Sequence, residues 1–412
     1  MYAFIYVFKA NQRNKNDPVS LLRKALSELL VSYYPLSGKL LRRKIDRKLQ
    51  LVCNLEGVPF AVATADRDLR SLNYIENLSD EFALQLVHEL DVNYQSEIGC
   101  HPFSLQVTKF PCGGFTIGIA VTHALCDGYG VATIFNALTE LASGKSEPSV
   151  VPVWQREKMV EKLDDEPANV PGADKECLLA ISPYMPSSSC DMVIETIDIT
   201  AENMKKLKDK VVLKESFTTF EVLCAYLWKS TSRALKLNID GITVLKISVG
   251  IRHVLDPPLP EGYYGNAYVD VFTEITAGEL DESSISDIVK LVKRAKKTAL
   301  DKRFIEEQLR NTERLVKEDA KFKGVTDGIL LMTDLRNTGL FRPNDFGWNE
   351  PVNIWPLTPQ EIPSNIGVIM RPSKLDPSME GGAKVVMTLP RDAMADFKKE
   401  TNNMNKLSFS KI

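Results

Sequence analysis

The sequence has few of the residues that mark the commoner kinds of catalytic or metal site. It contains four histidines and seven cysteines in 412 residues, and the cysteines form no C-x-x-C pair. An odd number of widely spaced cysteines supports neither a disulfide framework nor a zinc site, and it is typical of free thiols in a reducing compartment. Motifs of the G-x-S-x-G, H-E-x-x-H and phosphate-loop types are also absent from the sequence.

Two further absences narrow the class of protein. The charges nearly cancel, with 51 Lys and Arg against 54 Asp and Glu, so the basic excess expected of a nucleic-acid binder is missing. The opening apolar run, M-Y-A-F-I-Y-V-F, has no basic residue before it and is too short for a signal peptide, and no run reaches the roughly 18 residues of a membrane span. The sequence therefore predicts a cytoplasmic protein that binds neither nucleic acid nor membrane.

The composition is that of an ordinary globular chain, with 44% hydrophobic and 25% charged residues. The length suits two domains of about 200 residues each. From 146 to 190 the chain is rich in Ser, Pro, Asp, Glu and Lys and has weak periodicity, which is typical of a connection between domains. We therefore predict an N-terminal domain over 1–145, a crossover over 146–190 and a C-terminal domain over 191–412.

Apolar periodicity predicts both strands and helices in each domain. Strands are expected at 1–9, 104–110, 115–122, 192–200, 242–250, 266–275, 328–335 and 383–389. Helices are expected at 17–30, 131–142, 218–235 and 284–317, with a polar helix after the last strand. The mixture predicts two domains of the α/β class.

One histidine lies where acid–base chemistry would be well served. His123 follows a predicted strand and precedes a predicted helix, and it is the only histidine with an acid, Asp127, four residues later. A loop held at both ends by regular structure can aim an imidazole, the side chain that titrates near neutral pH, as a general base requires. A plainer interpretation stays open, in which Asp127 caps the helix and His123 is a polar residue at a strand end.

A second constellation is the stretch D-F-G-W-N-E-P, which begins at Asp345. An aspartate, two aromatic residues, a glycine and a closing proline predict a rigid loop, and the aspartate could pair with an arginine. Taken by itself the stretch is interpreted as structural, because aromatic side chains on a loop usually fill a core.

Together the two motifs resemble the H-x-x-x-D-G and D-F-G-W-G signatures of the BAHD family of plant acyl-CoA-dependent acyltransferases, in the same order. Residues 33–40, Y-Y-P-L-S-G-K-L, and 257–266, P-P-L-P-E-G-Y-Y-G-N, are similar to two other family segments, as is V-W at 153–154. The resemblance covers nearly the whole chain. Within the family, the chain is most similar to members that acylate small alcohols with acetyl or benzoyl groups, and to the taxane acyltransferases.

The resemblance implies an architecture and an activity. The fold would be two chloramphenicol-acetyltransferase-like domains of mixed sheet plus helices with a solvent channel between them, and a segment near 352–380 would cross back to the first domain. The protein would be a monomeric O-acyltransferase of plant specialised metabolism that moves an acyl group other than aminoacyl from acyl-CoA to a small alcohol. Acyl-CoA would be a co-substrate, with no metal and no permanently bound cofactor. N-acylation of an amine and an inactive homologue that binds CoA or another ligand remain as alternatives.

The resemblance also implies roles for particular residues. His123 would be the general base that takes the acceptor's proton, with no acyl-enzyme, and Asp127 of the same catalytic motif would pair with Arg252 and hold the loop. Support of the site would come from the second motif, namely Asp345, Phe346, Gly347 and Trp348. Asn349 replaces the last glycine of that motif, and asparagine is among the few residues that tolerate a positive φ. The residues that contact CoA stay unknown at this stage.

Overall fold

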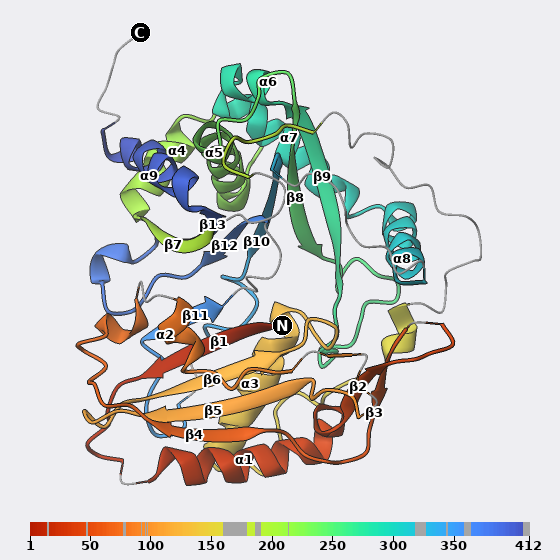
Figure 1. Ribbon diagram of the computed structural model, residues 1–412, viewed down its shortest axis with the longest axis vertical. Coiled ribbons are helices and arrows are strands. Elements are labelled where there is room, and N and C mark those ends of the chain that lie inside the picture. The colour runs from red at the N-terminus through yellow and green to blue at the C-terminus, as the bar shows by residue number, and fades with distance from the viewer. Residues whose placement is uncertain are drawn as a thin grey trace.

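The computed structural model describes residues 1–14, 16–46, 48–76, 80–91, 93–94, 96, 98–159, 179–185, 191–212, 214–317, 327–342, 345–357 and 364–406. Within these ranges the chain forms two halves, each built on a β-sheet with helices packed against it (Figure 1). No helix in the described ranges is both long enough and apolar enough to cross a membrane.

The first half is a mixed sheet with helices on its faces. Among the described residues its sheet has five strands, in the order β11 (Asn353–Leu357), β1 (Tyr2–Phe8), β6 (Phe115–Val121), β5 (Phe103–Lys109) and β4 (Phe60–Thr64). The pairs are antiparallel except for β4 with β5. The other elements of this half are α1 (Pro18–Ser32), the hairpin β2 (Lys39–Arg42) with β3 (Leu49–Val52), α2 (Asp80–Leu84) and α3 (Gly128–Ala142).

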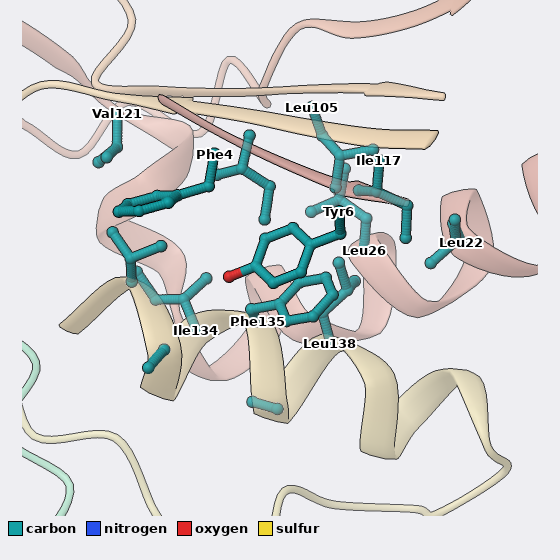
Figure 2. Close-up of a cluster of buried hydrophobic side chains, with 14 of the residues drawn as sticks. Phe4, Tyr6, Leu22, Leu26, Leu105, Ile117, Val121, Ile134, Phe135 and Leu138 are labelled. Carbon is teal, nitrogen blue, oxygen red and sulfur yellow. The ribbon is translucent and has the colours of Figure 1, made fainter. Parts of the chain in front are cut away.

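The alternation of side chains along β1 explains its central place in the first half. Phe4 and Tyr6 point toward α1 and α3, and the Tyr6 ring stacks on Phe135 of α3 with 3.7 Å between ring centroids (Figure 2). Ile5 and Val7 point to the opposite face and are buried in a second apolar cluster. Since both faces of β1 are covered, the strand is fixed firmly enough to position the residues at its ends.

The second half has the same plan with a larger sheet. In the part of the chain that the structure describes, its sheet has six strands, in the order β7 (Met192–Ile199), β13 (Ala383–Pro390), β12 (Asn365–Met370), β10 (Ile329–Asp334), β8 (Ile242–Gly250) and β9 (Tyr268–Thr276). β10 runs parallel to both β8 and β12, and the outer pairs are antiparallel. The helices are α4 (Ala201–Asp209), α5 (Thr219–Ala234), α6 (Ala277–Glu282), α7 (Ile285–Thr298), α8 (Lys302–Lys317) and α9 (Arg391–Lys406). One apolar cluster joins the sheet to these helices.

The chain passes between the halves more than once. Of the expected crossover at 146–190, residues 160–178 and 186–190 lie outside the described residues. In the described part, the Val153 N–H donates to the Gly262 carbonyl at 2.8 Å. Of the segment near 352–380, β11 pairs with β1 in the first sheet, whereas β12 pairs with β10 and β13 in the second. The second half therefore contributes an edge strand to the first.

The predicted strands and helices are present, with one error in the second half. A single helix was expected at 284–317, but α7 ends at Thr298 and α8 begins at Lys302. Asp301 explains the break, because its carboxylate accepts hydrogen bonds from the N–H groups of Arg303 and Phe304 and so caps the second helix.

Candidate active site

His123 lies where the two halves meet. It occupies the turn between β6 and α3, and its ring is exposed. The ring of Tyr2, at the start of β1, lies 4.8 Å from the imidazole between centroids, and the ring of Tyr268, at the start of β9, lies 5.9 Å away at an angle of 63°. One aromatic wall thus comes from each half of the molecule.

The imidazole itself is free to meet a ligand. No hydrogen bond from the described residues reaches either ring nitrogen of His123, and the loop is held instead through its backbone. The Asn266 side-chain amide donates to the His123 carbonyl at 2.7 Å. The loop is therefore held through its backbone, and two aromatic rings lie beside the exposed imidazole.

Asp127 is buried, and its carboxylate is bound by groups other than the His123 imidazole. The Arg252 guanidinium donates to both carboxylate oxygens at 2.8 Å, which is a bidentate ion pair. The same carboxylate accepts the N–H of Gly130 at 3.0 Å, as the cap of α3, and the N–H of Ala267 at 3.0 Å. The plainer interpretation of Asp127 as a helix cap is thus correct, and the pairing with Arg252 that the resemblance implies is present as well.

Arg252 carries this anchor across to the second half. It follows β8, its guanidinium donates to the Gly265 carbonyl at 2.6 Å, and its Cζ lies 4.3 Å from the ring centroid of Tyr129 on α3. Because the ion pair is buried, the removal of either partner would leave an uncompensated charge in the protein. The geometry assigns Asp127 and Arg252 to holding the loop.

Burial keeps the other proton-bearing groups around His123 in their neutral forms. Desolvation raises the pKa of the Cys126 thiol to about 12, and it raises the pKa of the Tyr2 hydroxyl well above its usual range. The pKa of Tyr268 is raised to about 12, mainly by burial and to a smaller extent by the charge of Asp270. None of these three groups is therefore a base or a thiolate near neutral pH.

The second motif forms a tight loop built by its own aspartate. The Asp345 carboxylate accepts the N–H groups of Gly347 at 2.7 Å and Asn349 at 3.1 Å, and no ion pair reaches it from the described residues. The arginine partner that the sequence left open is therefore not what organises this loop. Gly347 has a φ of 108° and Asn349 a φ of 61°, so the asparagine occupies the left-handed region as expected.

The structure does not bring the two motifs together. Phe346 and Trp348 are buried against the ring of Phe115 at the start of β6, whereas His123 follows the end of that strand. A strand of this length separates its ends by about 20 Å, at 3.3 Å per residue. The side-chain amide of Asn11 fastens the loop further by donating to the Gly347 carbonyl at 2.7 Å. The second motif and His123 thus lie at opposite ends of β6.

A large cavity lies in the second half, where β8, β10 and β12 end. Its volume is about 1090 Å³, and the first turn of α5 forms part of its wall. The charged side chains that line it are Lys296, Arg336, Arg371, Lys374, Asp334, Asp376 and Glu380. This cavity could not be predicted from the sequence, because its residues come from segments that only the fold brings together.

The cavity adjoins the wall of the candidate base. Gly250 lines the cavity and pairs with Tyr268 in the β8–β9 ladder, and the ring of Tyr268 contacts His123. On its far side the cavity meets the N-terminus of α5, which Thr218 caps by accepting the N–H of Glu221. The N-terminus of a long helix attracts anions through its free N–H groups and its dipole.

Sequence reasoning found His123, Asp127 and Arg252 but missed the aromatic walls. Tyr2 and Tyr268 carry no local signal. Tyr2 becomes a neighbour of His123 through the pairing of β1 with β6, and Tyr268 through the contact of the second half with the first. Asn266 ends a segment whose similarity to the family was noted, and that position could have been named. Among the described residues no three His, Cys, Asp or Glu side chains gather as a metal site would require.

Comparisons with known proteins agree with the geometry. The sequence model of the Transferase family matches residues 1–404. The chain is 63% identical to "Spermidine coumaroyl-CoA acyltransferase" of Arabidopsis thaliana over 99% of this chain and 89% of that protein. It is 51% identical to "Spermidine sinapoyl-CoA acyltransferase" of the same plant, over 97% and 89%. The crystal structure of vinorine synthase matches with a TM-score of 0.72 at 21% identity, over 96% of this chain and 87% of that one, which shows the fold.

Proposed function

Because the chain belongs to the Transferase family, the BAHD acyltransferases of plant specialised metabolism, we propose that it transfers an acyl group from acyl-CoA to an amine of the spermidine class, with His123 as the general base. The observation that carries the proposal is the exposed imidazole at the junction of the halves, anchored by the buried pair of Asp127 and Arg252.

The choice of an amine reverses the order in which the sequence ranked the acceptors. An alcohol was expected first and an amine second. Both stayed open because one base can serve both reactions. The relatives that are 63% and 51% identical are both named for spermidine, and their donors are coumaroyl and sinapoyl thioesters. We therefore propose N-acylation with an aromatic acyl-CoA of that kind.

The proposed reaction needs one proton acceptor and no covalent enzyme intermediate. The free amine attacks the thioester carbonyl, an N–C bond forms, and the His123 imidazole accepts the proton that the nitrogen loses. The C–S bond then breaks, and the departing CoA thiolate takes the proton from the imidazolium. Cys126 does not compete as a nucleophile, because burial raises the pKa of its thiol to about 12.

We place the CoA phosphates in the large cavity at the ends of β8, β10 and β12. The basic side chains of Arg371 and Lys374 and the N-terminus of α5 offer contacts to phosphate there. The thioester would then pass Gly250 and Tyr268 to reach His123. The amine would approach the imidazole from its exposed side.

A thiol-release assay tests the proposal. Coumaroyl-CoA and sinapoyl-CoA are each offered to spermidine, to fully N-acetylated spermidine and to a small alcohol, and we expect release with spermidine alone. His123→Ala should lower kcat by about 10²–10⁴-fold, the usual range for a lost general base. Its thermal midpoint should stay unchanged, because the ring is exposed. Turnover of the alcohol without spermidine, or an active His123→Ala protein, would contradict the proposal.

A further inference from the structure

The guanidinium of Arg156, in the described part of the crossover, is enclosed by aromatic rings. Its Cζ lies 4.0 Å from the ring centroid of Trp154, 5.2 Å from that of Tyr264 and 5.5 Å from that of Tyr263. Its Nε and Nη2 atoms are buried and have no hydrogen-bond partner among the described residues, and no carboxylate there pairs with it. Cation–π attraction to three rings and a hydrogen bond with the Tyr263 side chain therefore hold this charge in place.

The same guanidinium packs directly on the backbone at Gly265. A Cβ atom added to Gly265 would lie 1.8 Å from Nη1 of Arg156, so only glycine allows this approach. Beside it, Val153 of the crossover forms a bridge with Tyr263. The crossover and the segment that ends in G-N are thus fastened together by stacking and by backbone pairing.

This segment in turn holds the loop of the candidate base. Within residues 265–267, one carbonyl accepts a hydrogen bond from Arg252 at 2.6 Å, and one side-chain amide donates to the His123 carbonyl at 2.7 Å. One backbone N–H donates to Asp127 at 3.0 Å. These three hydrogen bonds, which hold the His123 loop and its anchor from the second half, therefore all involve the backbone on which Arg156 is stacked or residues next to it.

We infer that Arg156 is a positioning residue for His123, acting through residues 263–266. The inference rests on the proposed function, in which His123 is the base. Loss of the stacked guanidinium would let the segment and the attached loop shift, and a displacement of about 1 Å in a reacting group can cost on the order of 100-fold in rate. The binding of acyl-CoA, which the cavity beyond Tyr268 would provide, should change little.

The test compares kcat with KM in Arg156→Ala and Arg156→Lys. We expect kcat to fall about 100-fold in the alanine variant and about 10-fold in the lysine variant, which keeps the charge but not the planar stacking. KM for acyl-CoA should stay within about threefold. Arg23→Ala is the matched control, since Arg23 is an exposed arginine 5.0 Å from the single ring of Phe60, and it should leave kcat unchanged.

Hydrogen exchange gives a second readout that needs no turnover. Peptides over 121–128 and 262–267 should exchange faster in Arg156→Lys than in the wild type, and those over α1 should not. If the alanine variant fails to fold, the lysine variant still decides. Unchanged kcat with unchanged exchange in Arg156→Lys would overturn the inference. A wild-type protein that turns over no substrate would instead contradict the proposed function, and the exchange measurement would still test the link from Arg156 to the loop.

Discussion

At the scale of single residues, the histidine and the aspartate of the loop after β6 lie four positions apart in opposite environments. The His123 ring is exposed and contacts Tyr2 and Tyr268, whereas the Asp127 carboxylate is buried and saturated with donors from the protein. The aspartate can therefore neither orient the imidazole nor take its proton. Its contacts instead hold the loop in place.

The buried pair sets the stability of this loop. Asp127→Ala removes one partner and leaves the guanidinium of Arg252 without a counter-charge, so we expect a loss of about 3–5 kcal/mol in the free energy of unfolding, measured in urea. In the double variant Asp127→Ala with Arg252→Met, part of that loss should be recovered. A single-variant loss below about 1 kcal/mol would show that the pair is not buried as described.

The thiols offer a test of burial that does not depend on catalysis. Burial raises the pKa of Cys126 to about 12 and that of Cys224 well above its usual value, so both stay protonated and covered at pH 8. Cys53 and Cys112 are exposed. Iodoacetamide at pH 8, followed by peptide mass mapping, should label the exposed pair and leave the buried pair unmodified until the protein is denatured. Labelling of Cys126 in the native protein would contradict the packing around His123.

At the scale of elements, the sequence predicted the longer strands and helices and missed several shorter ones, among them β12, although that strand is largely buried. β2 and β3 escaped because their hairpin turn is built from charged residues and contains no glycine. β11 was not predicted because Pro356 lies within its five residues. A proline, which lacks an N–H donor, is tolerated there because β11 is the edge strand of the sheet. The break between α7 and α8 escaped because the helical period continues across it, with Asp301 as the interruption.

The loop after β10 allows a matched pair of substitutions at Asn349. Its φ of 61° lies in the left-handed region, which costs an ordinary L-residue about 1–2 kcal/mol. Asn349→Gly, which restores the family residue, should leave the free energy of unfolding within about 0.5 kcal/mol of the wild type, whereas Asn349→Ala should lower it by about 1 kcal/mol. Equal effects of the two variants in urea would contradict the backbone conformation described for this loop.

At the scale of the whole molecule, the site is a junction, and this limited what could be predicted. The resemblance supplied His123 and Asp127 because both belong to one motif that is continuous in sequence, and it supplied Arg252 as the implied partner of that aspartate. Tyr2 and Tyr268 lie 266 residues apart in the numbering, and the large cavity draws on α5, α7 and the ends of three strands. No local spacing or periodicity reports such neighbours, since they are created by the packing of one half on the other.

The cavity leads to a prediction about the stability of the assembled molecule. A ligand at 100 times its Kd raises the free energy of unfolding by about 2.7 kcal/mol, so CoA should raise the thermal midpoint of the wild type. Arg371→Glu, at the cavity wall, should weaken CoA about tenfold and reduce that rise. Arg23→Glu on α1 serves as the control, and an equal rise in both variants would place the CoA phosphates elsewhere.

Strand β11 makes the stability of the first half depend on the second. A fragment that stopped before it would leave β1 as the uncovered edge of its sheet, with a row of unpaired backbone groups open to association with other chains. Neither half is thus a self-sufficient unit that could be expressed, exchanged or duplicated without the other. Fragments divided within the crossover should become soluble only when they are produced together. Both halves are therefore needed for a functional enzyme.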